Sequence, residues 1–437
     1  MPSQPNVIVV VTDTVRRDRV SCYGHERPTT PALDAFAERA TRFGDPISQA
    51  PWSIPAHASL LTGAVPADHG ATTVRPVLRC EETLPALLKT AGYETYAVSA
   101  NEYVRPMTGF GRGFDEFYTP GRVTAPDPLV RALGPVVNTV TSTAALRRPV
   151  ERAFNKFLTT DDPSTVTGTE GATDDGTVDR VLDIVDRAHE PYFLYAPLMD
   201  AHLPRSPARD PFEQFVDPDL REVELTATER AHVFSEDRRL EECERRKLRQ
   251  LYDADLRTMD DRLGRLLSGL EARGALDDSL VVLVSDHGEH LGEFDLIGHQ
   301  HSVFDSVVSV PLVVKVPGQD EGRTVPGQFE TRRVFHTILD EAGVRAYPDR
   351  TLANGSPDET ATGAFYTPMI DIGRLVWDRT VEYDRRLLGE RLSFARADGH
   401  KLVRQATDEW LLTTPESPGA RLSPDEHADI YARLAGE

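Results

Sequence analysis

Lysine, cysteine and long apolar runs are all scarce in this chain of 437 residues. The three cysteines, none of them in a C-x-x-C pair, are too few for a disulfide framework or a zinc knot. No apolar run approaches the ~20 residues that a membrane-spanning helix needs, and the first residues lack the basic segment of a signal peptide. We therefore expect a cytoplasmic protein without an integral membrane segment.

Basic residues are also fewer than acidic ones: the chain has 49 Lys+Arg and 70 Asp+Glu, which gives a formal net charge of −21. A surface this acidic repels phosphate backbones, so we expect no nucleic-acid partner. Only five of the basic residues are lysines. Excess acid with few lysines favours a protein that stays dispersed in the cytoplasm of a high-salt organism, although an acidic protein from a GC-rich genome has the same composition.

Apolar runs alternate with helical periodicity, which predicts a layered α/β fold around a mostly parallel sheet. The clearest helical pattern covers residues 247–273, in which six leucines and Met259 share one face and Gly274 marks the end. Five short apolar runs are predicted to be buried strands: 7–11, 95–98, 192–195, 280–284 and 310–314.

Two further features set the expected domain organisation. Residues 127–158 look like helices outside the sheet, and the Thr-, Asp- and Gly-rich stretch 159–178 is predicted to be a loop, so we expect an insertion at about 120–180. Short alternating runs after residue 345 predict a small α+β unit. The expected division is a main domain over 1–345 and a C-terminal subdomain over 346–437.

Polar side chains follow the predicted strands. Asp13 comes directly after the first strand, Asp286 and His287 come after the fourth, and Asn101 and His202 follow the second and third within a few residues. Because ligands of open α/β sheets bind at the carboxyl ends of the strands, these groups should converge. Two carboxylates and an imidazole at one edge predict a site for a divalent cation.

A candidate nucleophile lies at the start of a predicted helix. Ser53 precedes Pro55, and Gly63 marks the end of the segment, so Ser53 is expected at the N-cap. A hydroxyl there faces free backbone N–H groups and the positive end of the helix dipole, which together accept a tetrahedral anion such as phosphate or sulfate. A plain serine cap is the alternative.

These segments, in this order, are similar to those of a known family. The chain resembles the sulfatase family of the alkaline phosphatase superfamily, which implies an alkaline-phosphatase-like three-layer fold and a catalytic main domain. The matching blocks are Asn6–Gly24, Arg27–Asp34, Ser53–Gly63, Gly109–Phe114, Asp200–Pro204, Tyr252–Leu267 and Ser285–Pro311.

The resemblance implies that Asp13, Asp286 and His287 hold one divalent metal, with Ser53 as nucleophile and further ligand. Oxygen ligands suit Ca²⁺, Mg²⁺ or Mn²⁺, and the imidazole also suits Zn²⁺. Thr14 departs from sulfatases in which a second Asp follows the first. The identity of the metal therefore stays open.

The resemblance also implies catalytic and substrate-binding positions. His202 matches the family histidine that contacts the ester group, and His299 stands where many sulfatases have a lysine that helps to protonate the leaving group. Asn101 matches a position that contacts the anionic substrate. A packing role for His299 is the alternative, as is a second metal held by Asp200, His202 and His299.

One position departs from the family pattern. Sulfatases oxidise a Cys or Ser to formylglycine within C/S-x-P-x-R, whereas this chain has His57 in place of the arginine. Histidine cannot form the bidentate fork of a guanidinium. The departure argues against formylglycine at Ser53, and we place His57 among the substrate-binding residues.

The expected function is a sulfatase-like, metal-dependent hydrolase of sulfate or phosphate esters, with a small-molecule, glycan or lipid-headgroup substrate. A serine phosphate is readily hydrolysed beside a metal, whereas a hydrated aldehyde expels sulfate by re-forming its carbonyl, so an unmodified Ser53 favours phosphate esters. The first alternative is a transferase or phosphodiesterase acting on glycans or lipid headgroups. The second is an inactive, metal-stabilised binding module.

Overall fold

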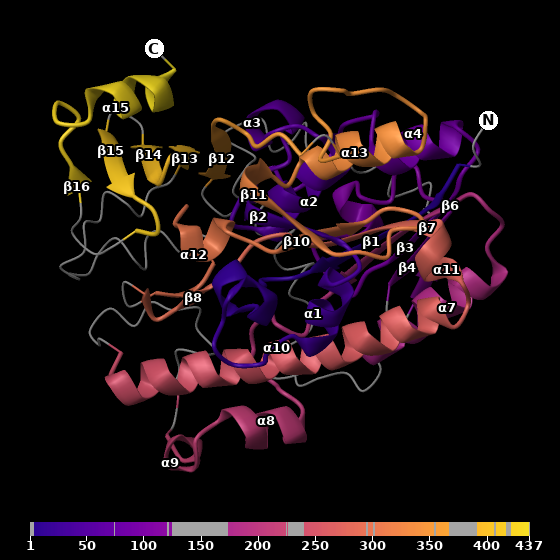
Figure 1. Ribbon diagram of the computed structural model, residues 1–437, viewed down its shortest axis with the longest axis horizontal. Helices are drawn as coiled ribbons and strands as arrows, with labels where there is room; N and C mark the ends of the chain where they lie inside the picture. The colour runs from indigo at the N-terminus through magenta and orange to yellow at the C-terminus, as the bar shows by residue number, and fades with distance from the viewer. Residues whose placement is uncertain are drawn as a thin grey trace, which may run out of the picture.

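The computed structural model describes most of the chain (Figure 1). The residues described are 4–73, 75–119, 122–124, 174–223, 225, 240–293, 296–299, 302–353, 355–366, 391–405, 408–416 and 421–436. The predicted helices at 127–158, and the loop predicted from 159 as far as residue 173, lie outside these residues.

A nine-stranded sheet forms the centre of the molecule, in the order β11-β2-β10-β7-β1-β6-β3-β4-β5. In it β10 runs antiparallel to β7 and β2, and β5 runs antiparallel to β4, while the other neighbours are parallel. The strands are β1 (Asn6–Thr12), β2 (Thr41–Ile47), β3 (Glu94–Val98), β4 (Glu116–Thr119), β5 (Arg122–Thr124), β6 (Tyr192–Leu198), β7 (Ser279–Ser285), β10 (Leu312–Lys315) and β11 (Arg323–Glu330). The predicted mostly parallel sheet is confirmed.

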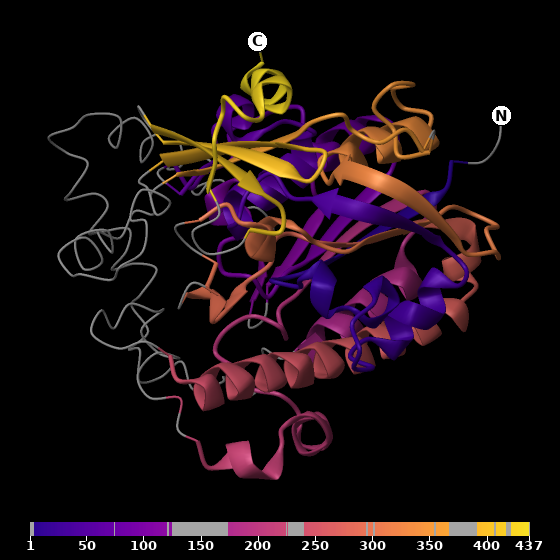
Figure 2. The same cartoon turned by 60° about the vertical axis from the view of Figure 1, so that its left-hand side comes forward.

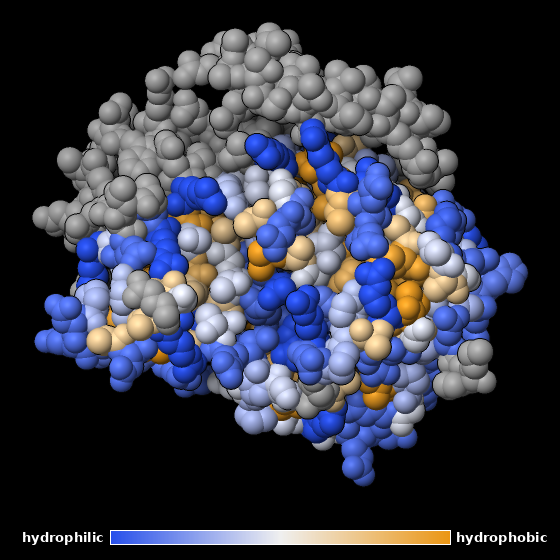
Figure 3. Space-filling model, turned by 90° about the horizontal axis from the view of Figure 1, so that it is seen from above, coloured by the Kyte–Doolittle hydropathy of each residue, from blue (hydrophilic) through white to orange (hydrophobic). Residues whose placement is uncertain are grey.

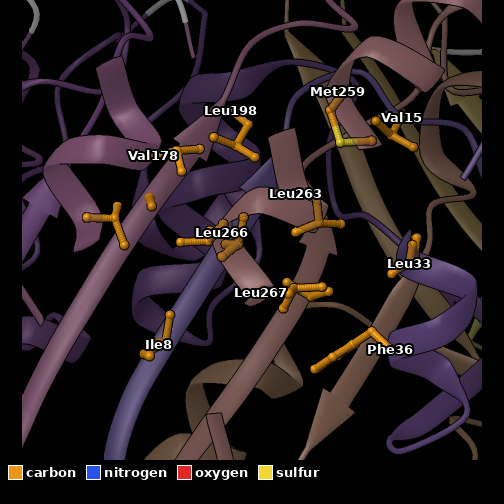
Figure 4. Packing of buried hydrophobic residues seen from close by; sticks show 14 of the residues in the cluster. Ile8, Val15, Leu33, Phe36, Val178, Leu198, Met259, Leu263, Leu266 and Leu267 are labelled. Atoms are coloured by element: carbon orange, nitrogen blue, oxygen red, sulfur yellow. The ribbon is translucent and has the colours of Figure 1, made fainter. Parts of the chain in front are cut away.

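Both faces of this sheet are buried, because side chains alternate along each strand. In β1, Ile8 and Val10 pack in one core cluster and Val7, Val9 and Val11 in another. Figure 4 shows part of the first cluster, which contains Leu263, Leu266 and Leu267 together with Ile8. Helices therefore cover the sheet on two sides, and the fold has the three expected layers.

The first layer contains the long helix α10 (Glu242–Glu271) with α1 (Pro31–Ala37) and α7 (Asp174–Arg187), and α8 (Arg209–Phe215) and α9 (Pro218–Arg221) lie outside α10 (Figure 1). The opposite layer contains α2 (Ser53–Thr62), α3 (Pro66–His69), α4 (Leu84–Thr90) and α13 (Arg333–Glu341). Short connections include α11 (Ala275–Asp278), α12 (Asp305–Val308) and the two-residue pair β8 (His290–Leu291) and β9 (Ile297–Gly298).

A second, antiparallel sheet lies toward the C-terminus. Its strands, in order, are β12 (Ala361–Tyr366), β13 (Arg391–Ala397), β14 (His400–Gln405), β15 (Asp408–Thr413) and β16 (Arg421–Leu422). The helix α15 (Ala428–Ala435) covers its outer side (Figure 2), and its inner side packs on α12 through Phe394, Val403 and Trp410. The predicted C-terminal α+β subdomain is confirmed.

Local predictions differ from the structure at the start of α7 and in several strands of the central sheet. The stretch 174–178, predicted to be part of a loop, is the first part of α7, because acidic residues stabilise the N-terminus of a helix. Strands β2, β4, β5 and β11 of the central sheet were not predicted. For β2 and β11 the sequence gives the reason. Both contain glycine and proline, Gly44 with Pro46 and Pro326 with Gly327, which break the apolar pattern of a buried strand.

One face of the molecule shows how hydrophilic and hydrophobic residues are distributed on the surface. On the face seen in Figure 3, hydrophilic residues surround scattered hydrophobic ones. In the part of the chain that the structure describes, no helix is both long and apolar enough to cross a membrane.

Candidate active site

The carboxyl ends of the central parallel strands bring the predicted site residues together. Thr12 of β1 pairs in register with Ser285 of β7, so the next residues, Asp13 and Asp286, lie side by side. The backbone N–H of Asp13 donates to the carbonyl oxygen of Leu198, the last residue of β6. Neighbouring parallel strands therefore place both carboxylates at one edge of the sheet, as the sequence predicted.

Asp13, Asp286 and His287 are arranged to share one cation. Among the described residues, their ligand atoms form a group within 4.8 Å of one another. His287 Nε2 lies 3.4 Å from Asp286 Oδ2 and 4.0 Å from Asp13 Oδ1. A hydrogen bond of 2.9 Å between Nδ1 of His287 and the carbonyl oxygen of Gly288 makes Nδ1 the donor and turns the Nε2 lone pair toward the carboxylates.

Two buried oxygen atoms in this group fit a metal ion. Asp13 Oδ1 and Asp286 Oδ2 are both buried and accept no hydrogen bond within the described residues. Buried polar atoms are normally paired, so an unpaired carboxylate oxygen on each side of an imidazole nitrogen is the arrangement that a divalent cation completes.

The two carboxylates differ in their surroundings. Burial, and next the charge of Asp286, raise the pKa of Asp13. Although burial alone also raises the pKa of Asp286, the neighbouring His287 and His57 lower it below its ordinary value. Two like charges this close repel each other without a cation between them.

Ser53 lies at the start of α2 and points into this group. Its hydroxyl oxygen is 3.3 Å from Asp13 Oδ2, to which it donates, and 3.4 Å from His287 Nε2. The sequence placed Ser53 at the N-cap, but the N-cap is Trp52 and Ser53 is the first helical residue. The hydroxyl contacts the ligand group and makes no capping hydrogen bond, whereas Gly63 ends the helix in the left-handed conformation as predicted.

Asn101 and Thr14 hold the ligand carboxylates in place. Asn101 Nδ2 donates to Asp13 Oδ2 at 2.8 Å, and the backbone N–H of Thr14 donates to Asp286 Oδ1 at 3.2 Å. Thr14 has φ +60°, an unusual value for a β-branched residue, and strain of this kind is common beside functional sites. Asn101 contacts a metal-ligand candidate, and its contact with a substrate stays a prediction.

His57 is completely buried under the site. Its Nε2 lies 3.2 Å from Asp286 Oδ2, and its Nδ1 shares a hydrogen bond of 2.6 Å with the Tyr195 hydroxyl. Burial, and next the charge of Asp286, raise the pKa of Tyr195 well above its ordinary value, so this phenol stays protonated. The structure places His57 behind a ligand carboxylate, and its contact with a substrate stays a prediction.

His202 and His299 form the other side of the site. Their ring centroids are 5.4 Å apart, and the His299 ring centroid is 4.4 Å from that of His287. The carboxylate of Asp200 is paired with Arg262, so its charge is already balanced outside the group that a second metal would need. The structure therefore brings the two histidines together and pairs Asp200 elsewhere.

Three further residues support the site and were not predicted. Tyr195 on β6 contacts His57, while Arg205 and Glu289 form an ion pair whose carboxylate also lies 3.7 Å from His299 Nδ1. Arg205 follows the block Asp200–Pro204, and Glu289 lies inside the block that begins at Ser285. Their positions beside or within these motif blocks were the sequence feature that could have identified Arg205 and Glu289 as part of the site.

Comparisons with known proteins agree with this geometry. An ulvan-active sulfatase from Formosa agariphila is 25% identical over 352 residues, covering 79% of this chain and 63% of that protein. The multifunctional alkaline phosphatase superfamily protein PehA of Trinickia caryophylli is 36% identical over 136 residues, covering 29% of this chain and 26% of that protein. This chain thus spans less than two-thirds of the length of either relative.

A solved structure shares the fold. The phosphonate monoester hydrolase of Agrobacterium radiobacter superposes with a TM-score of 0.70 at 20% identity, covering 99% of this chain and 94% of that one. The family model described as Sulfatase matches residues 5–344, which include every candidate site residue discussed above. The chain therefore belongs to the sulfatase family, within the alkaline phosphatase superfamily.

Proposed function

We propose that this protein hydrolyses sulfate or phosphate esters with the Ser53 hydroxyl as nucleophile. The observation that carries the proposal is the position of that hydroxyl, between Asp13 Oδ2 and His287 Nε2 at the first turn of α2. Free backbone N–H groups at the start of a helix favour the tetrahedral anion that an ester group presents. Membership of the sulfatase family supports the same chemistry.

Asp13, Asp286 and His287, with Ser53, would hold a divalent metal. When bound, the cation would supply positive charge that lowers the pKa of the serine hydroxyl and neutralises the ester oxygens. Asn101 and the Thr14 backbone hold the two carboxylates in fixed positions. The oxygen and nitrogen donors support Ca²⁺, Mg²⁺, Mn²⁺ and Zn²⁺ alike.

The chain's own residues divide the reaction into two steps. Ser53 loses its hydroxyl proton to water, its Oγ attacks the phosphorus or sulfur atom, and the bond to the leaving oxygen breaks. Water then attacks the serine ester, releases the anion and returns a proton to Oγ. We assign His202 and His299 to the leaving oxygen, because their rings lie side by side next to His287. An imidazolium there donates the proton that the departing oxygen needs.

Phosphate esters are favoured if Ser53 is unmodified. His57 replaces the motif arginine and contacts Asp286, which supports an intact serine. The phosphonate monoester hydrolase that shares the fold adds support for phosphorus chemistry.

The test combines mass and activity. Intact mass of the Ser53 peptide should show no loss of a hydrogen pair, and the metal-loaded protein should hydrolyse 4-nitrophenyl phosphate or the monoester 4-nitrophenyl phenylphosphonate. Loss of the hydrogen pair would instead indicate formylglycine and favour 4-nitrophenyl sulfate. Ser53→Ala should abolish turnover of whichever ester is cleaved while preserving the fold, and turnover retained in that variant would refute the nucleophile.

A further inference from the structure

A fully buried arginine lies behind the two catalytic histidines. The side chain of Arg205 has no exposed surface, and its guanidinium lies 4.7 Å from the ring centroid of Tyr252. It is paired with Glu289, and its Nη1 lies 3.5 Å from Asp255 Oδ2. A buried guanidinium is costly unless several partners satisfy it, so these contacts fix its position closely.

Arg205 reaches the backbone that carries His202. Nη1 donates to the carbonyl oxygen of Ala201, the residue before His202. The same carbonyl accepts a hydrogen bond of 2.8 Å from the Thr14 hydroxyl, and His202 Nδ1 is 2.5 Å from the carbonyl oxygen of Leu203. The turn that presents the His202 ring is thus held on its buried side by Arg205 and Thr14.

Arg205 also acts on His299, through Glu289. Its Nη2 pairs with Oε2 of Glu289, while Oε1 of the same carboxylate lies 3.7 Å from Nδ1 of His299. Glu289 is completely buried, and His299 is 4% exposed. The guanidinium thus holds one oxygen of this carboxylate, and the other oxygen faces the imidazole ring of His299 at ion-pair distance.

We propose that Arg205 is a positioning residue that sets the distance and orientation between His202 and His299. The inference rests on the proposed function, because it assigns both rings to the leaving oxygen. One guanidinium bridges the Ala201 carbonyl and the Glu289 carboxylate, a planar fork that a lysine ammonium cannot reproduce. The candidate metal ligands Asp13 and Asp286 are held instead by the Asn101 amide and by the Thr14 backbone N–H.

The dependence of the rate on the leaving group distinguishes a positioning role of Arg205 from a purely structural one. Esters with a good leaving group, such as 4-nitrophenol, depart with little need for a proton, whereas phenyl or alkyl esters depend on the donated proton. Arg205→Lys should therefore lower kcat for the phenyl ester by roughly 10²-fold. The kcat for the 4-nitrophenyl ester and the Kd for Mn²⁺ should stay nearly unchanged.

Two further variants test whether the effect of Arg205→Lys comes only from poor folding. Glu289→Gln preserves the side-chain shape and should give the same selective loss, even if Arg205→Lys folds poorly. Arg333→Lys is the matched control, because Arg333 is also buried and donates to the carbonyl oxygens of Arg350 and Ser356, away from the site. Arg333→Lys should lower the melting temperature without changing the ratio of kcat for the phenyl ester to kcat for the 4-nitrophenyl ester.

A crystal structure of Arg205→Lys separates this inference from the proposed function. We expect the His202 and His299 rings to move apart or rotate, while Asp13 and Asp286 keep their positions. Unmoved rings, or equal losses on both esters, would overturn the positioning role. If the wild-type protein cleaves no ester, the proposed function fails, and the ring positions alone decide this inference.

Discussion

Nε2 of His57 lies 3.2 Å from Oδ2 of Asp286, so the residue that replaces the motif arginine touches a metal-ligand candidate. The other ring nitrogen is engaged by the Tyr195 hydroxyl, which fixes the orientation of the imidazole. Groups that hydrogen-bond metal ligands orient them and tune metal affinity. The substitution in the motif thus connects the helix of Ser53 to the cation site.

His57→Ala should weaken metal binding. Removal of the imidazole leaves Asp286 Oδ2 without its neighbour and free to rotate, so we expect the Kd for Mn²⁺ to rise by about 10- to 100-fold in titration calorimetry. Tyr195→Phe retains the ring packing and removes one hydrogen bond, so its effect should be smaller. An unchanged Kd in His57→Ala would contradict this role.

Metal should stabilise the fold through Asp13 and Asp286. Without a cation the two buried carboxylates repel each other. A metal ion at a free concentration of about 100 times its Kd should therefore add about 2.7 kcal/mol to the free energy of unfolding. Asp13→Asn removes the repulsion, so the metal-free variant should melt above the metal-free wild type and gain little from added metal. A full metal response in Asp13→Asn would show that the ligand assignment is wrong.

Acid should destabilise the protein through a buried histidine. Burial lowers the pKa of His290 to about 4, so the ring stays neutral in the fold while the unfolded chain takes up a proton below its ordinary pKa of about 6.5. The contribution of the neutral His290 ring to the free energy of unfolding is complete above about pH 6.5 and is lost as the pH falls toward 4. At about pH 5 the loss is about 2 kcal/mol.

The measurement is urea unfolding at several pH values. His290→Gln retains partners for the Ser302 and Ser306 hydroxyls and should flatten the dependence between about pH 6.5 and 4. His189→Gln is the control, since that side chain is 87% exposed, and it should leave the slope unchanged. The same slope in all three proteins would count against His290.

Lys401 should be essential for attachment of the C-terminal sheet. This lysine is fully buried, with Asp305 and Glu416 both 2.6 Å from Nζ. Lys401→Met removes the cation that pairs with the buried Glu416 and leaves Asp305 paired with Arg396, so we expect a loss of about 3–5 kcal/mol in the free energy of unfolding. Lys89→Met, which removes an exposed ion pair with Asp115, should cost under about 1 kcal/mol. Equal costs would refute the role of burial.

The strand ends were the most predictable part of the molecule. Buried parallel strands have continuous apolar runs, so residues 7–11 and 280–284 identified β1 and β7, and the polar residues after them identified Asp13, Asp286 and His287. The geometry that joins them then followed from a general property of parallel sheets.

The supports of the site could not be predicted in the same way. Arg205, Glu289 and Asp255 come from three separate segments, and only the packing of α10 against the sheet brings them together. Lys401 of β14 and Asp305 at the start of α12 likewise come from segments far apart in the sequence. A single charged residue in a sequence gives no sign of whether it is buried, and most are not.

The unequal lengths of the strands behind the site have a consequence for its motion. Asp13 follows β1, which is paired along its whole length with β6 and β7, whereas His299 follows β9, a two-residue strand paired only with β8 in the described residues. Short ladders open far more often than long central ones. His299 is thus expected to fluctuate more than Asp13, and also more than His202, which follows the long central strand β6. In the proposed reaction, the side that would hold the cation is therefore stiffer than the loop that carries His299.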